Sequence, residues 1–120
     1  TVQIDLLGGL GSDHFNFTSI PNSTSIQNIN DFSGSGAGND GDKLGFKSSV
    51  FNGLINSETR SGTSGSGTPT ATVSHAQLLY NYDTGILYYD ADGIGSANSP
   101  VEIVRLGINT DLSASDIVIY

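Results

Sequence analysis

The segment best suited to bind an ion is a glycine-rich turn near the start of the chain, residues 8–13 (GGLGSD). Gly8, Gly9 and Gly11 allow the backbone to adopt positive φ and to turn tightly, which aligns carbonyl oxygens along the inside of the turn. Asp13 adds a carboxylate where the turn ends. Carbonyl and carboxylate oxygens are the hard ligands that calcium selects. The pattern predicts a calcium-binding turn; the alternative is an ordinary glycine-rich turn before a strand.

A second acidic, glycine-rich segment spans residues 31–42. It begins with Asp31 and ends with Asp40 and Asp42, which flank Gly41. Acids at alternate positions of a loop project their oxygens into a shared space, as calcium loops require. The segment is therefore a candidate source of metal ligands, and the alternative is a flexible link.

A third acidic turn, residues 90–95 (DADGIG), resembles the opening of an EF-hand loop. Val101 stands at the twelfth position, where an EF-hand needs a bidentate glutamate, and no helices flank the segment, so an EF-hand is not expected. Two interpretations of Asp90 and Asp92 stay open. They bind calcium, or they bond nearby amides in a tight turn.

Catalytic patterns are absent from the sequence, and we expect no enzyme. His14 and His75 are the only histidines, and neither has the spacing of a zinc site. His14 falls on the strand face opposite Phe15 and Phe17, where an exposed side chain is expected. No nucleophile elbow, phosphate-binding loop or dinucleotide fingerprint occurs.

Charge and composition limit the partners. The 120 residues suit one domain with a modest core, since 36% of them are hydrophobic. Twelve acids face four bases, a formal charge of −8. This balance argues against nucleic acid and against an anionic membrane surface, both of which attract basic residues. No apolar run approaches a membrane span, so no membrane insertion is expected. Because the chain has no cysteine, a small secreted domain of this kind needs a stabilising crosslink other than a disulfide, and a bound metal ion is the usual one.

Periodicity predicts a mostly β fold, because apolar residues alternate in short segments and no long helical period occurs. The clearest signal is a hairpin over residues 78–89, with a glycine-containing turn at residues 83–85. Residues 48–53 and 109–116 each suit one helical turn. Residues 59–70 are hydrophilic and of low complexity, which predicts an exposed loop. Further strands are expected at residues 1–7, 15–20, 43–46, 101–106 and 117–120.

Four stretches together resemble the C-terminal end of an RTX protein, the haemolysin-type calcium-binding repeat family of bacterial type I secretion. Residues 8–17 (GGLGSDHFNF) are similar to a last nonapeptide repeat. Residues 29–32 (INDF), followed by residues 41–44 (GDKL), resemble the segment that commonly comes next. The terminal hairpin and the closing strand of the family resemble residues 79–93 (LYNYDTGILYYDADG) and residues 112–119 (LSASDIVI).

The resemblance implies a single domain, residues 1–120. Residues 1–20 would be the last turn and strand of a parallel β-roll, and residues 21–120 a C-terminal antiparallel β cap of sandwich type. It also implies Ca²⁺ as cofactor, the N-terminal repeats of a parent protein and the type I secretion apparatus as partners, and a secreted or cell-surface location. The function implied is a non-catalytic domain that caps the β-roll, folds on calcium outside the cell and carries or adjoins the secretion signal.

Two departures from the family pattern bear on the site. Gly45 stands where the family has a second acid, and Ile4 where a preceding repeat would place its aspartate. Because a β-roll ion lies between two successive turns, residues 8–13 would form half a site. The other half would come from repeats before Thr1 or from an acid within residues 31–42.

The alternative function is a calcium-dependent adhesin or a carbohydrate-binding module. Tyr80, Tyr82, Tyr88 and Tyr89 lie in one hairpin and could form an aromatic platform. Alternation along the strands divides these rings between two faces, and packing of one face in the core is the commoner outcome. A third possibility, an accessory domain of a secreted hydrolase, differs only in the parent protein.

Overall fold

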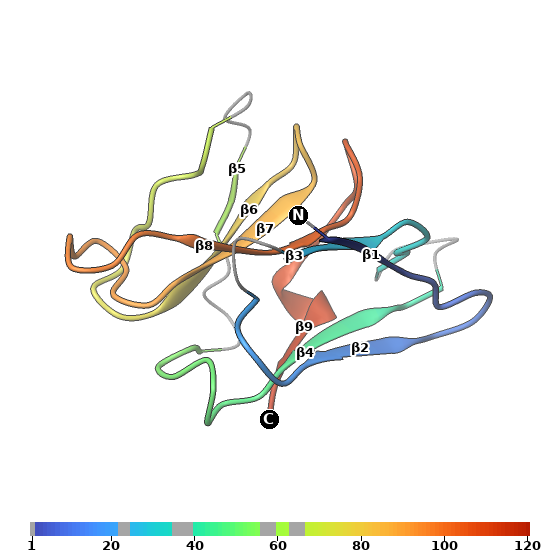
Figure 1. Cartoon of the computed structure of the whole chain (residues 1–120), viewed down its shortest axis with the longest axis horizontal. Coiled ribbons are helices and arrows are strands. Elements are labelled where there is room, and N and C mark those ends of the chain that lie inside the picture. The colour runs from blue at the N-terminus through green and yellow to red at the C-terminus, as the bar shows by residue number, and fades with distance from the viewer. Residues whose placement is uncertain (1, 22–24, 35–39, 56–59, 63–66) are drawn as a thin grey trace.

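Two β-sheets lie one above the other (Figure 1). The computed structural model describes residues 2–21, 25–34, 40–55, 60–62 and 67–120. Within these residues, nine strands form a six-stranded sheet of order β1-β3-β8-β7-β6-β5 and a three-stranded sheet of order β2-β4-β9. The elements are β1 (Val2–Leu6), β2 (His14–Phe17), β3 (Ser25–Ile29), β4 (Lys43–Phe46), β5 (Arg60–Gly62), β6 (Gln77–Asn81), β7 (Ile86–Asp90), β8 (Val101–Arg105), η1 (Ala114–Asp116) and β9 (Ile117–Ile119). The predicted mostly β class is confirmed.

Three strand–turn–strand units, termed rungs, stack on one another. Rung 1 is β1, turn 1 (residues 7–13) and β2; rung 2 is β3, turn 2 (residues 30–42) and β4; rung 3 is β8, turn 3 (residues 106–116) and β9. The first strands of the rungs pair in parallel in the larger sheet, and the second strands do so in the smaller sheet. Each rung therefore runs from one sheet to the other, and the described parts of the three turns, which leave out residues 35–39, lie side by side.

Alternating side chains build the core between the sheets. Phe17 pairs with Phe46, which pairs with Ile119; the two phenylalanines belong to the buried apolar cluster, and Ile119 packs against it. The ring of Phe46 stacks on Phe17 and meets the edge of Phe51, with centroids 5.2 Å apart in both pairs. Phe51 in turn meets Tyr89 of β7, again at 5.2 Å. A continuous line of aromatic rings thus joins the two sheets.

The predicted hairpin forms as β6 and β7, in antiparallel register with Tyr80 opposite Leu87. Every residue of β6 is buried, on both faces of the sheet. Residues 67–73 cover the outer face, because Asn81 Nδ2 donates to the Gly67 carbonyl (2.6 Å) and Gln77 Oε1 accepts the amide of Thr72 (2.9 Å). Two buried amide side chains thereby hold this segment against the sheet.

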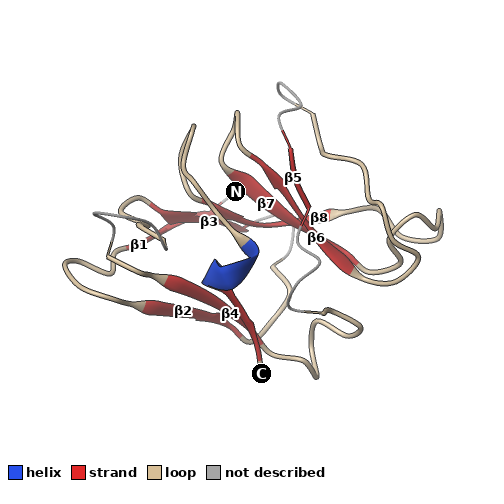
Figure 2. Cartoon of the chain, turned by 180° about the vertical axis from the view of Figure 1, so that it is seen from behind, coloured by secondary structure: helices blue, strands red, loops and turns tan. Residues whose placement is uncertain are grey.

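The structure differs from the expected layout in three places. Parallel stacking continues past residue 20 through rungs 2 and 3, so the antiparallel part is limited to β6, β7 and β8. Part of the expected loop 59–70 is strand β5, which pairs in parallel with β6; residues 59 and 63–66 lie outside the described residues. Of the two expected helical turns, residues 48–53 form a hydrogen-bonded turn, and the other is η1, seen at the entry to β9 in Figure 2.

Candidate functional site: three stacked turns

Turn 1 is held to turn 2 by the carboxylate of Asp31. The amide of Gly8 donates to Asp31 Oδ1 (3.1 Å) and the amide of Gly9 donates to Oδ2 (2.8 Å). The amides of Gly9 and Gly8 hold the pKa of Asp31 below its ordinary value, since they favour the ionised form. Gly9 and Gly11 have φ of 85° and 91°, as the sequence predicts for a tight turn. The structure therefore brings Asp31 to turn 1, where it accepts amides.

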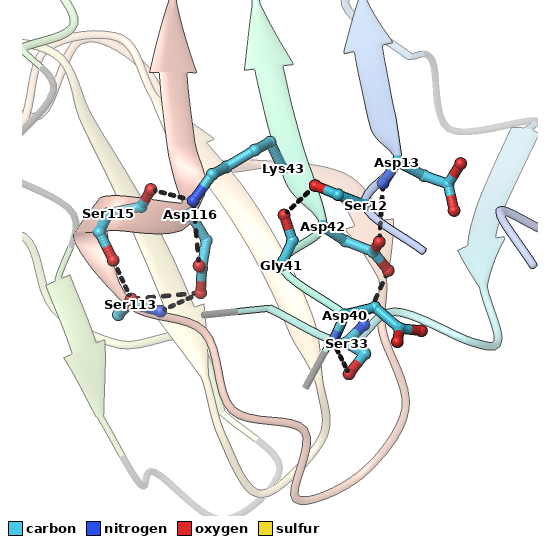
Figure 3. A network of polar contacts seen from close by, with 10 residues as sticks. All are labelled: Ser12, Asp13, Ser33, Asp40, Gly41, Asp42, Lys43, Ser113, Ser115 and Asp116. Atoms are coloured by element: carbon cyan, nitrogen blue, oxygen red, sulfur yellow. Dashed lines mark hydrogen bonds and ion pairs between the residues drawn. The ribbon is translucent and has the colours of Figure 1, made fainter. Parts of the chain in front are cut away.

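Asp42 makes a second link between the same two turns (Figure 3). Its Oδ1 accepts the amide of Asp13 (2.9 Å), and its Oδ2 accepts the amide of Ser33 (2.9 Å). The side chain is fully buried. The backbone adds two bonds alongside, from Lys43 N to Asp13 O and from the Ser12 hydroxyl to the Gly41 carbonyl, both 2.8 Å. Asp42 thus acts as an acceptor for two turns at once.

Turn 3 carries an acid that sequence reasoning missed. Asp116 is 1% exposed, and its Oδ2 accepts the amide and the hydroxyl of Ser113, at 2.9 and 3.2 Å. Its Oδ1 lies 3.8 Å from Lys43 Nζ, which also donates to the Ser115 carbonyl (2.9 Å). Ser113-x-x-Asp116 is a capping-box pattern that could have revealed this role. Lys43 and Asp116 therefore join turn 2 to turn 3.

Asp13 differs from the other turn acids. Its Oδ2 is buried and has no hydrogen-bond partner. A Cβ added to Gly8 would lie 2.6 Å from this oxygen, so the glycine at that position is what leaves room for the carboxylate. Asp13 precedes β2, an edge strand of the smaller sheet, and its side chain points away from Asp42 (Figure 3). The free acceptor thus lies on rung 1, which ends the stack of described rungs.

Asp40, another predicted ligand, and Gly45 lie at positions that are less suited to a shared metal site. Asp40 is exposed, and its amide donates to the Ser33 hydroxyl (3.1 Å). Gly45 is buried beneath Asn16 and Tyr120, whose side chains occupy the space that a larger residue would need. In the described part of the chain, no three His, Cys, Asp or Glu side chains gather closely enough to hold a metal ion. Turn 1 and the described ends of turn 2 meet through amide–carboxylate contacts.

Asp90 and Asp92 lie apart from the stacked turns, at the end of β7. Asp90 Oδ1 accepts the amide of Asp92 (3.2 Å), and Asp92 Oδ2 accepts the amides of Ala97 and Asn98, at 2.9 and 3.2 Å. These are the amide contacts of a tight turn, one of the two interpretations that the sequence left open. These hydrogen bonds hold the loop that follows β7 in a compact conformation.

The two carboxyl groups also affect each other's pKa. Burial and the hydrogen bond with Asp92 raise the pKa of Asp90, which is 4% exposed. Although burial opposes it, the amides of Asn98 and Ala97 lower the pKa of Asp92. Asp92 Oδ1 is buried and lacks a donor as long as Asp90 is ionised, and a proton on Asp90 supplies one. Asp90 is therefore the acid of the pair.

We expect the substitution Asp90→Asn to raise thermal stability by a few degrees at pH 7 and to leave it nearly unchanged at pH 4. The folded-state pKa of Asp90 is raised, so the stability contributed by its protonated form is present at low pH and is lost as pH rises through that pKa. Asparagine stays neutral and still has a donor for Asp92. Thermal unfolding from pH 4 to pH 7 measures this, with Asp83→Asn as control. A loss of stability at pH 7 would contradict the raised pKa of Asp90.

The tyrosines of the hairpin do not form one platform. Tyr80 and Tyr89 are buried, and their hydroxyls donate to the carbonyls of Thr110 (2.6 Å) and Asn52 (2.9 Å). Burial raises the pKa of both phenols. Tyr82 and Tyr88 are half-buried. Tyr82 packs against the core cluster that contains Tyr80 and Tyr89, whereas Tyr88 pairs with Leu79 on the other face of the sheet. The rings are thus divided between two faces, as the alternation predicts.

Comparisons of the chain with protein-family models, with curated proteins and with solved structures find no match. In the residues that the structure describes, no helix has the length and apolar character needed to cross a membrane. His14 is exposed at the start of β2, as expected. Function is therefore inferred from the geometry of the stacked turns.

Proposed function

We propose that this chain is a non-catalytic, calcium-stabilised terminal module that caps a parallel β-roll. The observation that carries the proposal is the buried, unpartnered Oδ2 of Asp13 on rung 1. At the junction of rungs 1 and 2, the carboxylates of Asp31 and Asp42 in turn 2 accept amides of turn 1. Asp13 lies on the outermost described rung, and its Oδ2, which lies beside Gly8 of its own turn, lacks such a donor.

The edges of rung 1 suit a further rung of the same kind. β1 is an edge strand of the larger sheet and β2 is an edge strand of the smaller one. Both already pair in parallel with rung 2 on their inner sides. Since both edges end at turn 1, a preceding strand–turn–strand unit could extend the two sheets and stack its turn on Asp13. We propose the repeats of a parent protein as this partner.

Calcium is the ion proposed for this junction. A carboxylate oxygen that is buried without a partner favours a bound cation, and the formal charge of −8 adds to that preference. Asp13 and the carbonyls of Gly8, Gly9 and Gly11 would supply oxygen ligands. Water would complete the coordination in this chain alone, and a preceding turn would replace that water in the assembled β-roll. When bound, calcium would neutralise the carboxylate and crosslink the two turns. Export by a type I apparatus and a location outside the cell belong to the same proposal.

Calcium should raise the melting temperature, and the substitution Asp13→Asn should abolish that rise. At a calcium concentration about tenfold above Kd, a single site adds about 1.4 kcal/mol, or roughly 5 °C for a domain of this size. Extracellular modules have Kd of order 10⁻⁴–10⁻³ M, so millimolar calcium is the appropriate range. Thermal unfolding in calcium, in magnesium and in a chelator measures the effect.

The exposed acid Asp111 provides the matched control. Asp111→Asn removes the same charge from turn 3 and should keep the full calcium response. Magnesium should give a smaller shift than calcium, because it demands octahedral geometry and releases its water reluctantly. An equal melting temperature in calcium and in chelator would refute the proposal. An unchanged response in Asp13→Asn would move the site away from turn 1.

A further inference from the structure

The acids that join the three turns already have a hydrogen-bond donor or a cationic neighbour at both carboxylate oxygens. Asp31 accepts two amides of turn 1, and Asp42 accepts one amide from turn 1 and one from its own turn. Asp116 accepts donors from Ser113 and lies beside the ammonium group of Lys43. These are charge-assisted contacts, which are shorter and stronger than bonds between neutral groups. Each junction between described turns is therefore bridged by protein donors.

Burial makes these donors essential to the fold. Asp42 is fully buried and Asp116 is 1% exposed, so an ionised carboxylate at either position needs compensation from its surroundings. Two amide donors on Asp42 provide that compensation without any cation. A cation placed at the same oxygens would compete with N–H groups whose hydrogens already point at them. The geometry at these junctions thus suits amides and lysine.

We propose that the three-rung stack forms without calcium, because Asp31, Asp42 and Asp116 join its turns through amides and Lys43. This inference rests on the proposed function and narrows it. Calcium would bind at the outer edge of rung 1, where Asp13 lies. Rungs 1 to 3 would already be folded in the absence of the ion. The module would thereby present a preformed edge onto which a calcium-dependent rung can be added.

The strand register supports the distinction between junctions that protein donors bridge and the calcium site proposed at rung 1. His14 pairs with Lys43, so Asp13 and Asp42 precede paired residues and lie level across the junction. Leu44 pairs with Ile117, which brings Asp116 level with Lys43. An acid therefore lies beside a base at the junction of rungs 2 and 3, and beside an amide at the junction of rungs 1 and 2. In rung 1, Asp13 keeps a buried oxygen without a donor.

The test is amide hydrogen exchange and thermal unfolding of the unmodified chain in a chelator. We expect cooperative melting, and exchange of the amides of Gly8, Gly9, Asp13 and Ser33 more than about a hundredfold slower than in the unfolded chain. Non-cooperative melting, or exchange at unfolded rates until calcium is added, would overturn the inference.

A substitution then separates amide acceptors from metal ligands. Asp42→Asn turns one acceptor oxygen into a donor facing an amide, and we expect a fall in melting temperature of roughly 10 °C, equal in calcium and in chelator. Loss confined to calcium would identify Asp42 as a metal ligand and overturn the inference. If Asp42→Asn does not fold, Asp31→Asn applies the same comparison at a half-buried position.

The two proposals fail in different ways. A wild-type chain that melts cooperatively in chelator but does not respond to calcium contradicts the proposed function and supports the preformed stack. A chain that is unfolded in chelator and folds in calcium supports calcium binding and contradicts the preformed stack.

Discussion

Replacing Gly85 with alanine is expected to destabilise the protein by roughly 4 kcal/mol or more, enough to unfold a domain of ordinary stability. Gly85 has φ of 72°, a left-handed conformation that costs a residue with a Cβ about 1 kcal/mol. The larger cost is steric, because the added Cβ would collide with the backbone carbonyl of Gly107 in turn 3. Backbone atoms cannot move aside without disturbing the bond from Leu106 N to Gly85 O (2.7 Å).

The matched control is Gly9→Ala. Gly9 has φ of 85°, but an added Cβ would meet nothing within 4 Å. We therefore expect only the conformational cost, about 1 kcal/mol. Urea denaturation gives the unfolding free energy of both variants. Equal losses would show that Gly107 can retreat, and that the hairpin turn and turn 3 are not rigidly packed together.

The substitution Phe46→Ala should cost about 3–5 kcal/mol, as for other large core aromatic residues. Phe46 is fully buried, stacks on Phe17 and meets the edge of Phe51. Phe51 in turn contacts Tyr89, so the cavity left by the removed ring would lie within the line of rings that joins the two sheets. The substitution should therefore destabilise both sheets.

Urea denaturation followed by far-UV circular dichroism measures the loss for Phe46→Ala. Leu10→Ala is the control, since Leu10 is 97% exposed and its truncation should change the unfolding free energy by less than about 0.5 kcal/mol. A separate early transition for one sheet, instead of a single weakened one, would show that the two sheets unfold independently.

The strands could be predicted from the sequence because side-chain alternation is a local property. Phe15 and Phe17 alternate with His14 and Asn16, and the structure turns the phenylalanines toward the core. The hairpin of β6 and β7 was predictable for the same reason, since a short glycine-containing turn joins its strands. Positive φ at Gly9 and Gly11 likewise follows from residue type.

The pairing of distant segments was not predictable in this way. β9 joins β4, and β8 joins β3, across a long stretch of intervening chain. Alternation shows which face of a strand is buried, but it does not show which strand lies alongside. As a result, the sequence predicts one parallel turn followed by an antiparallel cap, while the structure has three stacked rungs.

The acids illustrate the same limit at the site. By itself, the sequence determined where the carboxylates are concentrated, which turns need glycine, and that the fold is mostly β. Tertiary structure decided what each carboxylate meets: amides at Asp31 and Asp42, a lysine at Asp116, and no donor at Asp13 Oδ2. The physical reason is that amides, ammonium groups and calcium all satisfy the same oxygen atoms. Which of them a carboxylate binds depends on the neighbour that folding brings to it.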